Sequence, residues 1–501
     1  MSEIEEPIPE ESLAPGEQPL APIEQPLAAV EHPLAPAAET SPQGKLALLK
    51  EALRGSSLDY TQGPVGHALL MLAIPMVLET ALESVFALTN IFWVSRLGAG
   101  AITSVGLTES IVTLVYTIAI GLSIGVTAMV ARRIGAGDPE GAARSAVQAI
   151  ALGAGLSAAI GVCGILFGPE FLQLLGAEPE VVAEGSGYAR VLLGGNATIM
   201  LLFLLNAVFR GAGDAAIAMR LLWLANGINI VLDPFLIFGL GPFPEMGLTG
   251  AAVATTIGRG TAVVVQLATL LRRGSRVRVR RRHMRLDTAL LSRLVSLSAT
   301  GTFQVFVGMA SWIALIRILA SYGTEVVAGY TIAIRVVIFA LMPSWGLSNA
   351  AATMVGQGLG AGKPERAIRS VRLAGWWSAL ALGAVGLLFL AFAPWIVRVF
   401  TDDTATSRWA VMGLRIVALG FPFYGWGMVL EQSFNGAGDT RTPTWINIAC
   451  FWALELPAAW FLSRAGMGPM GVFVAIAVAY SAVPVIAGRA FKRGGWMSAR
   501  A

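Results

Sequence analysis

An internal repeat constrains this chain more than any other feature. Residues 129–140 read MVARRIGAGDPE, and residues 354–365 read MVGQGLGAGKPE. Residues 209–214 read FRGAGD, and residues 434–439 read FNGAGD. Both second copies follow the first by 225 residues, and the same offset relates Gly98 to Gly323, Pro169 to Pro394 and Arg190 to Arg415. One spacing kept over so long a stretch indicates two homologous halves.

Composition places these halves in a membrane. Of the 501 residues, 55% are hydrophobic and 13% are charged, whereas soluble proteins carry about 25% charged residues. The two cysteines lie in apolar runs, and the three histidines are scattered along the sequence. We therefore expect no disulfide framework, no metal centre and no cofactor. No catalytic constellation is evident either, so the chain is not expected to be an enzyme.

Apolar stretches long enough to cross a bilayer, about 20 residues each, occur twelve times. They lie near residues 66–94, 102–131, 142–167, 184–208, 215–240, 247–271, 289–319, 327–354, 367–393, 407–433, 442–464 and 468–490. The predicted fold is an all-α integral membrane protein whose twelve transmembrane helices form two homologous six-helix lobes. The lobes cover residues 61–271 and 288–491, with a basic interlobe loop over 272–287 and a short tail over 492–501.

Basic residues predict the orientation of the chain in the membrane. Arg132 and Arg133 follow the second span and Lys363 follows the eighth, while the opposite loops carry acids such as Glu178 and Glu180. This pattern favours a multi-pass protein of the bacterial inner membrane with both termini in the cytoplasm. The interlobe loop holds eight arginines within residues 272–285. Anionic lipid headgroups are the expected neighbours of such a loop, and no nucleic-acid partner is expected.

The first sixty residues differ in composition from the rest. EQPLA, EQPLA and EHPLA recur every seven residues from Glu17, Glu24 and Glu31. Proline in each unit excludes a continuous helix, so residues 1–60 are predicted to be a disordered, acidic, Pro/Ala-rich cytoplasmic tail. The tail is either dispensable or a docking segment.

Polar residues inside membrane spans are costly and often functional. In the first span, Glu79, Glu83 and Asn90 fall within about 40° of one helix face. Glu79 is near the expected midplane, where desolvation disfavours the charged form of a carboxyl. Such a group can take up a proton on one side of the membrane and release it on the other. Pro75, one turn earlier, predicts a hinge.

Further polar residues follow in later spans. Asn229 and Asp233 lie one turn apart in the fifth span, and Thr255 lies in the sixth. Residues that could line a cavity are Glu109, Arg259, Gln304 and Arg335. The alternative is purely structural, with buried ion pairs such as Arg259 with Asp233 or Glu109 holding the bundle together.

Six short motifs in order resemble the multidrug and toxic compound extrusion (MATE) transporters of prokaryotes, over residues 64–491. They are IPM at 74–76, FWVSRLG at 92–98, the repeated glycine turn at 135–138 and 360–363, NIVLDP at 229–234, GAAVAT at 250–255 and FNGAGDT at 434–440. The resemblance implies two lobes that alternate access and export amphipathic, often cationic compounds. Inward movement of H⁺ or Na⁺ would drive the export, without any bound cofactor.

The resemblance also implies where the coupling cation binds. Its roles fall on Asn90, Asn229, Asp233 and Thr255, and bending of the first helix falls on Pro75. The family has an aspartate where this chain has Asn90, which cannot carry a proton charge. We hypothesise that Glu79 or Glu83, on the same face, has become the titrating group.

Other functions stay open at this point. A flippase for a lipid-linked oligosaccharide of the same superfamily is the nearest alternative, although such flippases tend to have fourteen spans. A channel suits the duplicated two-lobe design less well than alternating access does. The acidic first lobe favours an organic cation as substrate. A monomer in the lipid bilayer is the expected state, because each chain holds both lobes.

Overall fold

The structure is a computed structural model that describes residues 44–55 and 58–499. In the first half of the chain, the helices are α1 (Lys45–Arg54), α2 (Val65–Val94), α3 (Ala99–Gly135), α4 (Pro139–Leu174), α5 (Pro179–Gly194), α6 (Asn196–Ala212), α7 (Ala215–Phe238) and α8 (Gly247–Leu271). The second half holds α9 (Thr288–Leu319), α10 (Thr324–Gly360), α11 (Pro364–Arg398), α12 (Thr404–Ala418), α13 (Phe421–Ala437), α14 (Arg441–Asn447), α15 (Leu456–Leu462) and α16 (Pro469–Lys492). Two π-helical stretches, Ile448–Glu455 and Ser463–Met467, continue α14 and α15.

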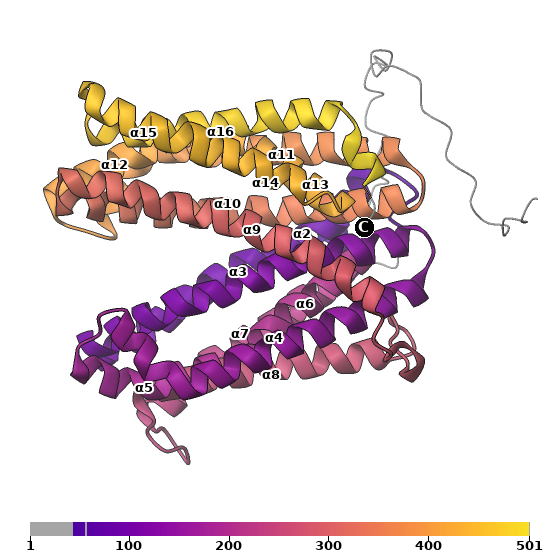
Figure 1. Ribbon diagram of the computed structural model, residues 1–501, viewed down its shortest axis with the longest axis horizontal. Coiled ribbons are helices and arrows are strands. Elements are labelled where there is room, and N and C mark those ends of the chain that lie inside the picture. Colours follow the sequence, from indigo (N-terminus) through magenta and orange to yellow (C-terminus); the bar gives the residue numbers. More distant parts are fainter. Residues whose placement is uncertain (1–43, 56–57, 500–501) are drawn as a thin grey trace, which may run out of the picture. The chain divides into compact units, whose positions relative to one another are not determined.

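The described part of the chain contains eleven helical segments that are long and apolar enough to cross a membrane. A bent pair, α12 and α13, turns by 60° at its break and completes a twelfth span. The predicted all-α fold with twelve spans is therefore confirmed. Figure 1 shows the helices of the two halves as two groups lying side by side.

The repeated motifs form tight turns between long helices. Gly213 and Gly438 end α6 and α13 in the left-handed conformation, at φ 87° in both copies. A side chain at Gly213 would also collide with the ring of Tyr60, 2.6 Å from the position of its Cβ. We call the end of the bundle that carries these turns the motif end.

At the motif end the two halves touch through corresponding residues. A Cβ on Gly135 would lie 2.1 Å from the carbonyl oxygen of Gln357, and one on Gly360 would lie 2.0 Å from that of Arg132. Arg132 and Gln357 are themselves related by the repeat offset of 225 residues. Only glycine permits α3 and α10 to approach so closely, so this part of the repeated motif encodes the contact between the halves.

The two lobes also exchange part of their cores. Leu69, Leu72 and Met76 of α2 pack in one hydrophobic cluster with the second half of the chain. Leu290 and Leu294 of α9 pack in a cluster with the first half. Both segments lie near the motif end, so the lobes interlock there. The predicted lobe boundaries at residues 271 and 288 follow the order of the chain. In the structure, α2 and the start of α9 pack against the lobe on the other side of those boundaries.

The prediction of a disordered tail over residues 1–60 is wrong for Lys45–Arg54, which form α1. This segment has no proline and buries Ala52, which is 1% exposed. The following turn is also fixed, because Arg366 donates hydrogen bonds to the backbone oxygens of Tyr60, Gln62 and Gly63. Residues 1–43, with the EQPLA repeats, lie outside the described residues.

Candidate functional site

Three predicted site residues meet between α7 and α8. Asn229, Asp233 and Thr255 are buried, with exposed fractions of 2%, 0% and 6%. With its nitrogen toward Asp233, the Asn229 amide donates to the carboxylate at 3.1 Å and accepts from the backbone N–H of Thr255 at 2.9 Å. A Cβ on Gly258 would lie 2.5 Å from the carbonyl oxygen of Ala225, so this glycine permits α8 to pack closely against α7. The structure thus brings these three residues together, and their role in cation coupling stays a prediction.

Two contacts of equal spacing fix the register of α2 against α7. The Trp223 indole donates to the carbonyl of Leu78 at 3.4 Å, and the rings of Trp93 and Phe238 lie 6.2 Å apart. Each pair differs by 145 residues, so the helices run parallel and Asn90 lies level with residue 235. That is about 3 Å along the axis from Asp233. The Asn90 Oδ1 atom is buried and has no hydrogen-bond partner among the described residues.

Glu79 lies in a second cluster, about 14 Å closer to the motif end by the same register. Its Oε1 accepts hydrogen bonds from Asn206 Nδ2 and Arg210 Nη1, both at 3.1 Å. Gln266 of α8 in turn donates to Asn206 at 2.6 Å. Glu79 is therefore part of an ion-paired network between α2, α6 and α8. No hydrogen bond or ion pair joins it to Asp233 in the described part of the chain.

Glu83 lies between these two clusters. Arg259 Nη2 is 3.8 Å from Glu83 Oε1, and the side chains are 9% and 29% exposed. The Arg259 guanidinium also lies over the rings of Phe86 and Tyr116, at 5.6 and 5.7 Å. Arg259 thus forms its ion pair with Glu83 rather than with Asp233 or Glu109, the partners that the structural alternative named.

The remaining predicted residues are more widely spread. Glu109 of α3 and Arg335 of α10 are exposed, while Arg259 and Gln304 are buried. Glu109 belongs to the first lobe and Arg335 to the second. Pro75 is buried within α2, which continues through it as one helix. The predicted cavity and hinge roles stay predictions.

The second half carries its own buried acids. Glu431 of α13 is 8% exposed, and Glu455, at the end of a π-helical stretch, is fully buried. Neither forms an ion pair with a described residue, and Glu455 has both carboxylate oxygens without a hydrogen-bond partner in the described part of the chain. Nearby, the rings of Tyr424 and Tyr480 stack at 4.0 Å.

Sequence reasoning missed the partners of Glu79. Arg210 lies in the repeated FRGAGD motif and reads as a charge that flanks a turn, although its side chain reaches inward to Glu79. Asn206 precedes it by four residues and therefore shares its helix face. Asn206 and Arg210, four residues apart in an otherwise apolar helix, could have indicated a polar partner for Glu79.

The arrangement provides two kinds of chemistry in the first lobe. Asp233 is an acid with neutral partners, suited to exchange a proton or to bind a small cation. Asn229 Oδ1 and Thr255 Oγ1 add oxygen ligands of the kind that hard cations prefer. Pro234 has no N–H, so the carbonyl of Ile230 loses its helical partner close by. Glu79 and Glu83, in contrast, already have cationic partners.

Comparison with known proteins assigns this arrangement to a family. The MatE family model matches residues 75–235 and, separately, residues 301–461, one match in each half. The chain belongs to the MATE family. The two matched segments begin 226 residues apart, close to the repeat offset of 225 residues in the sequence.

Similar proteins match this MATE chain over most of its length. It is 30% identical to the probable multidrug resistance protein NorM of Caulobacter vibrioides, over 82% of this chain and 88% of that protein. It is 26% identical to the probable multidrug resistance protein YoeA of Bacillus subtilis, over 83% and 91%. An outward-facing structure of a multidrug resistance MATE transporter superposes with a TM-score of 0.80 at 26% identity, covering 89% of this chain and 98% of that one.

Proposed function

We propose that this MATE transporter is an antiporter that exports amphipathic organic cations in exchange for H⁺ or Na⁺. The observation that carries this proposal is the buried Asp233 carboxylate, which has the neutral partner Asn229 and no ion pair with a described residue. A buried acid without a cation is poised to bind one. The names of the relatives, multidrug resistance proteins, support export of small molecules.

The contacts between the lobes support an outward-open state. The close approaches of Gly135 and Gly360, and the exchanged segments of α2 and α9, all lie toward the motif end. The basic residues of these turns favour the cytoplasmic side, with both chain termini there, in a bacterial inner membrane. Asp233 lies five residues before the opposite end of α7, about 8 Å along the axis. A cation from outside would therefore reach Asp233 while the cytoplasmic side is closed.

Binding of the cation would then favour the opposite state. A proton on Asp233, or a Na⁺ held by Asp233, Asn229 and Thr255, removes a buried negative charge from the first lobe. The organic cation and the coupling cation therefore compete for the same negative potential, which is the basis of antiport. Both lobes lie within one chain, so a monomer suffices for this cycle.

Of the two glutamates on this face of α2, Glu83 is the more accessible and the less tightly paired. Its side chain is 29% exposed and its ion pair with Arg259 spans 3.8 Å, whereas Glu79 is 6% exposed and accepts two hydrogen bonds at 3.1 Å. We propose that Glu83 compensates for the neutral Asn90. A Glu79→Gln/Glu83→Gln variant that keeps transport, while Asp233→Asn loses it, would remove this role from both glutamates.

The test is transport of a fluorescent organic cation in proteoliposomes that contain only this protein. A pH gradient and a sodium gradient are imposed separately. We expect one gradient to drive dye movement and Asp233→Asn to abolish it. If neither gradient moves the dye, the antiporter proposal fails, and the flippase alternative becomes the next hypothesis to test.

A further inference from the structure

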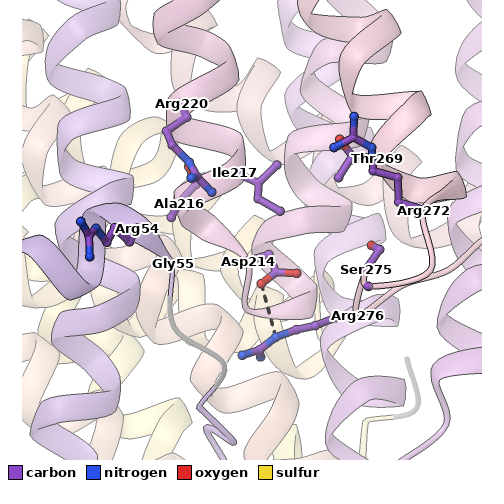
Figure 2. Close-up of a pocket in the computed structure, with 11 residues that line it drawn as sticks. Arg54, Gly55, Asp214, Ala216, Ile217, Arg220, Thr269, Arg272, Ser275 and Arg276 are labelled. Carbon is purple, nitrogen blue, oxygen red and sulfur yellow. Dashed lines mark hydrogen bonds and ion pairs between the residues drawn. The ribbon is translucent and has the colours of Figure 1, made fainter.

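An arginine-lined pocket lies at the motif end of the first lobe, away from the polar residues of the membrane spans. Its volume is about 440 Å³, within the range of small-molecule sites. Figure 2 shows Arg54 from the end of α1, Arg220 from α7, and Arg272 and Arg276 from the interlobe loop around it. Asp214 is the only acid among the described residues that line the pocket.

The walls of this pocket are fixed by specific contacts. Arg276 forms an ion pair with Asp214 at 3.3 Å, donates to the carbonyl of Leu58 at 2.9 Å and lies over the Tyr60 ring. Further along the loop, Glu140 pairs with Arg282 and with the buried His283. The basic loop is thus held against the first lobe at several points, and Arg272 and Arg276 have defined positions.

The pocket has an excess of positive charge. Asp214 is matched by Arg276, and burial raises the pKa of its carboxyl in spite of Arg276 and Arg220 nearby. Arg54, Arg220 and Arg272 form no ion pair with any described residue. Three like charges around one cavity repel each other, and an anion bound between them removes this repulsion. Planar guanidinium groups bind phosphate oxygens through paired hydrogen bonds.

Exposed apolar side chains on the segments that carry these arginines indicate a lipid as the source of the phosphate. Leu46 and Leu49 of α1 are 82% and 39% exposed, and Leu271, adjacent to Arg272, is 57% exposed. Trp223, three residues beyond Arg220 in α7, is 41% exposed. Exposed leucines and a tryptophan next to arginines are typical of a membrane interface.

We propose that this pocket binds the phosphate group of an anionic phospholipid from the adjacent leaflet. Arg54, Arg220 and Arg272 contact the phosphate, and the acyl chains lie along the exposed leucines. The bound lipid ties α1 and the interlobe loop to α7. This proposal does not depend on which compound or cation the protein transports.

Native mass spectrometry and thermal unfolding of the purified full-length protein test the proposal. Phosphatidylglycerol, phosphatidylcholine and inorganic phosphate are added separately at constant ionic strength. We expect phosphatidylglycerol to remain bound and to raise Tm. In Arg220→Gln/Arg272→Gln its apparent affinity should fall by roughly 30-fold. The matched control is Arg489→Gln/Arg493→Gln, which removes two exposed arginines at the end of α16 and should bind as the wild type does.

The arms of this experiment separate the possible outcomes. Stabilisation by inorganic phosphate alone, lost in the pocket variant, would support the phosphate site and reassign its source from lipid to a soluble anion. Equal losses in the pocket variant and the control would show a general surface-charge effect and overturn the proposal. Equal binding of phosphatidylglycerol and phosphatidylcholine would overturn it as well. Arg220→Lys/Arg272→Lys, which keeps the charge, should retain part of the affinity and shows that the site remains folded.

Discussion

The two halves of this MATE chain share their packing and differ in their charges. Gly135 and Gly360 form equivalent contacts, and Gly213 and Gly438 end equivalent helices with the same φ. The buried acids have no such correspondence. Glu79 is ion-paired with Arg210, whereas Glu455 is buried without a cationic partner in the described chain. The duplication therefore supplies a symmetric scaffold on which the two halves carry different buried acids.

This difference gives each half a distinct expected response to mutation. Removing one member of a buried ion pair leaves the other charge uncompensated. Removing an acid without a partner leaves no such charge. Symmetric glycine positions should give equal effects in both halves, and buried acids should give unequal ones.

The largest effect is expected at the symmetric contact. Gly135→Val and Gly360→Val each place side-chain atoms against a carbonyl oxygen that lies about 2 Å from the Cβ position. Each should cost about 3 kcal/mol and lower transport strongly, because α3 and α10 cannot close at the motif end. Thermal unfolding in detergent and dye transport measure both effects. Gly155→Val is the control, because nothing lies within 4 Å of the Cβ position there. A large difference between Gly135→Val and Gly360→Val would contradict the symmetry.

Glu79→Gln should show the asymmetry in the first lobe. It leaves Arg210, which is 15% exposed, without its carboxylate and should destabilise the protein by about 2 kcal/mol. The double variant Glu79→Gln/Arg210→Gln should recover part of this loss, and a double-mutant cycle of Tm values measures it. Additive losses would show that the pair contributes nothing as a pair.

Thr255→Val removes a hydroxyl but keeps the shape of the side chain. The variant loses the 3.0 Å hydrogen bond from Thr255 Oγ1 to the Asn229 amide oxygen. This loss should lower the free energy of unfolding by about 1 kcal/mol. A sodium-coupled transporter should also show a raised apparent Kd for Na⁺, because one oxygen ligand is lost. Titration of transport with Na⁺ checks this, and an unchanged titration would exclude Thr255 as a ligand.

The smallest effect is expected in the second lobe. Glu455→Gln removes a carboxylate that has no ion pair in the described chain. The free energy of unfolding should therefore change by less than about 0.5 kcal/mol, which the shift in Tm measures. A loss as large as that of Glu79→Gln would reveal a partner for Glu455 and remove the asymmetry.

The sequence predicted the spans because each is a long apolar run bounded by turn residues and charges, such as the repeated glycine motifs. The spacing of Asn229 and Asp233 predicted that they share one helix face, and the family motifs added Thr255 from another helix. The structure brings the three side chains together, and their coupling role stays a prediction. The sequence could not predict the Glu79–Arg210 pair, because a residue at a helix end reads as a surface charge. The exchanged segments of α2 and α9 also escaped prediction, since hydrophobicity does not specify which lobe a helix packs against.

We propose that cation coupling depends on Asp233 in the first lobe and not on the buried acids of the second. The most direct test compares Asp233→Asn with Glu431→Gln/Glu455→Gln in the same proteoliposome assay, under whichever imposed gradient drives the wild-type protein. We predict that Asp233→Asn falls to the rate of protein-free liposomes and that the second-lobe variant keeps most of its gradient-driven transport. Full transport in Asp233→Asn, with loss in Glu431→Gln/Glu455→Gln, would contradict a role for Asp233 and assign coupling to the second lobe.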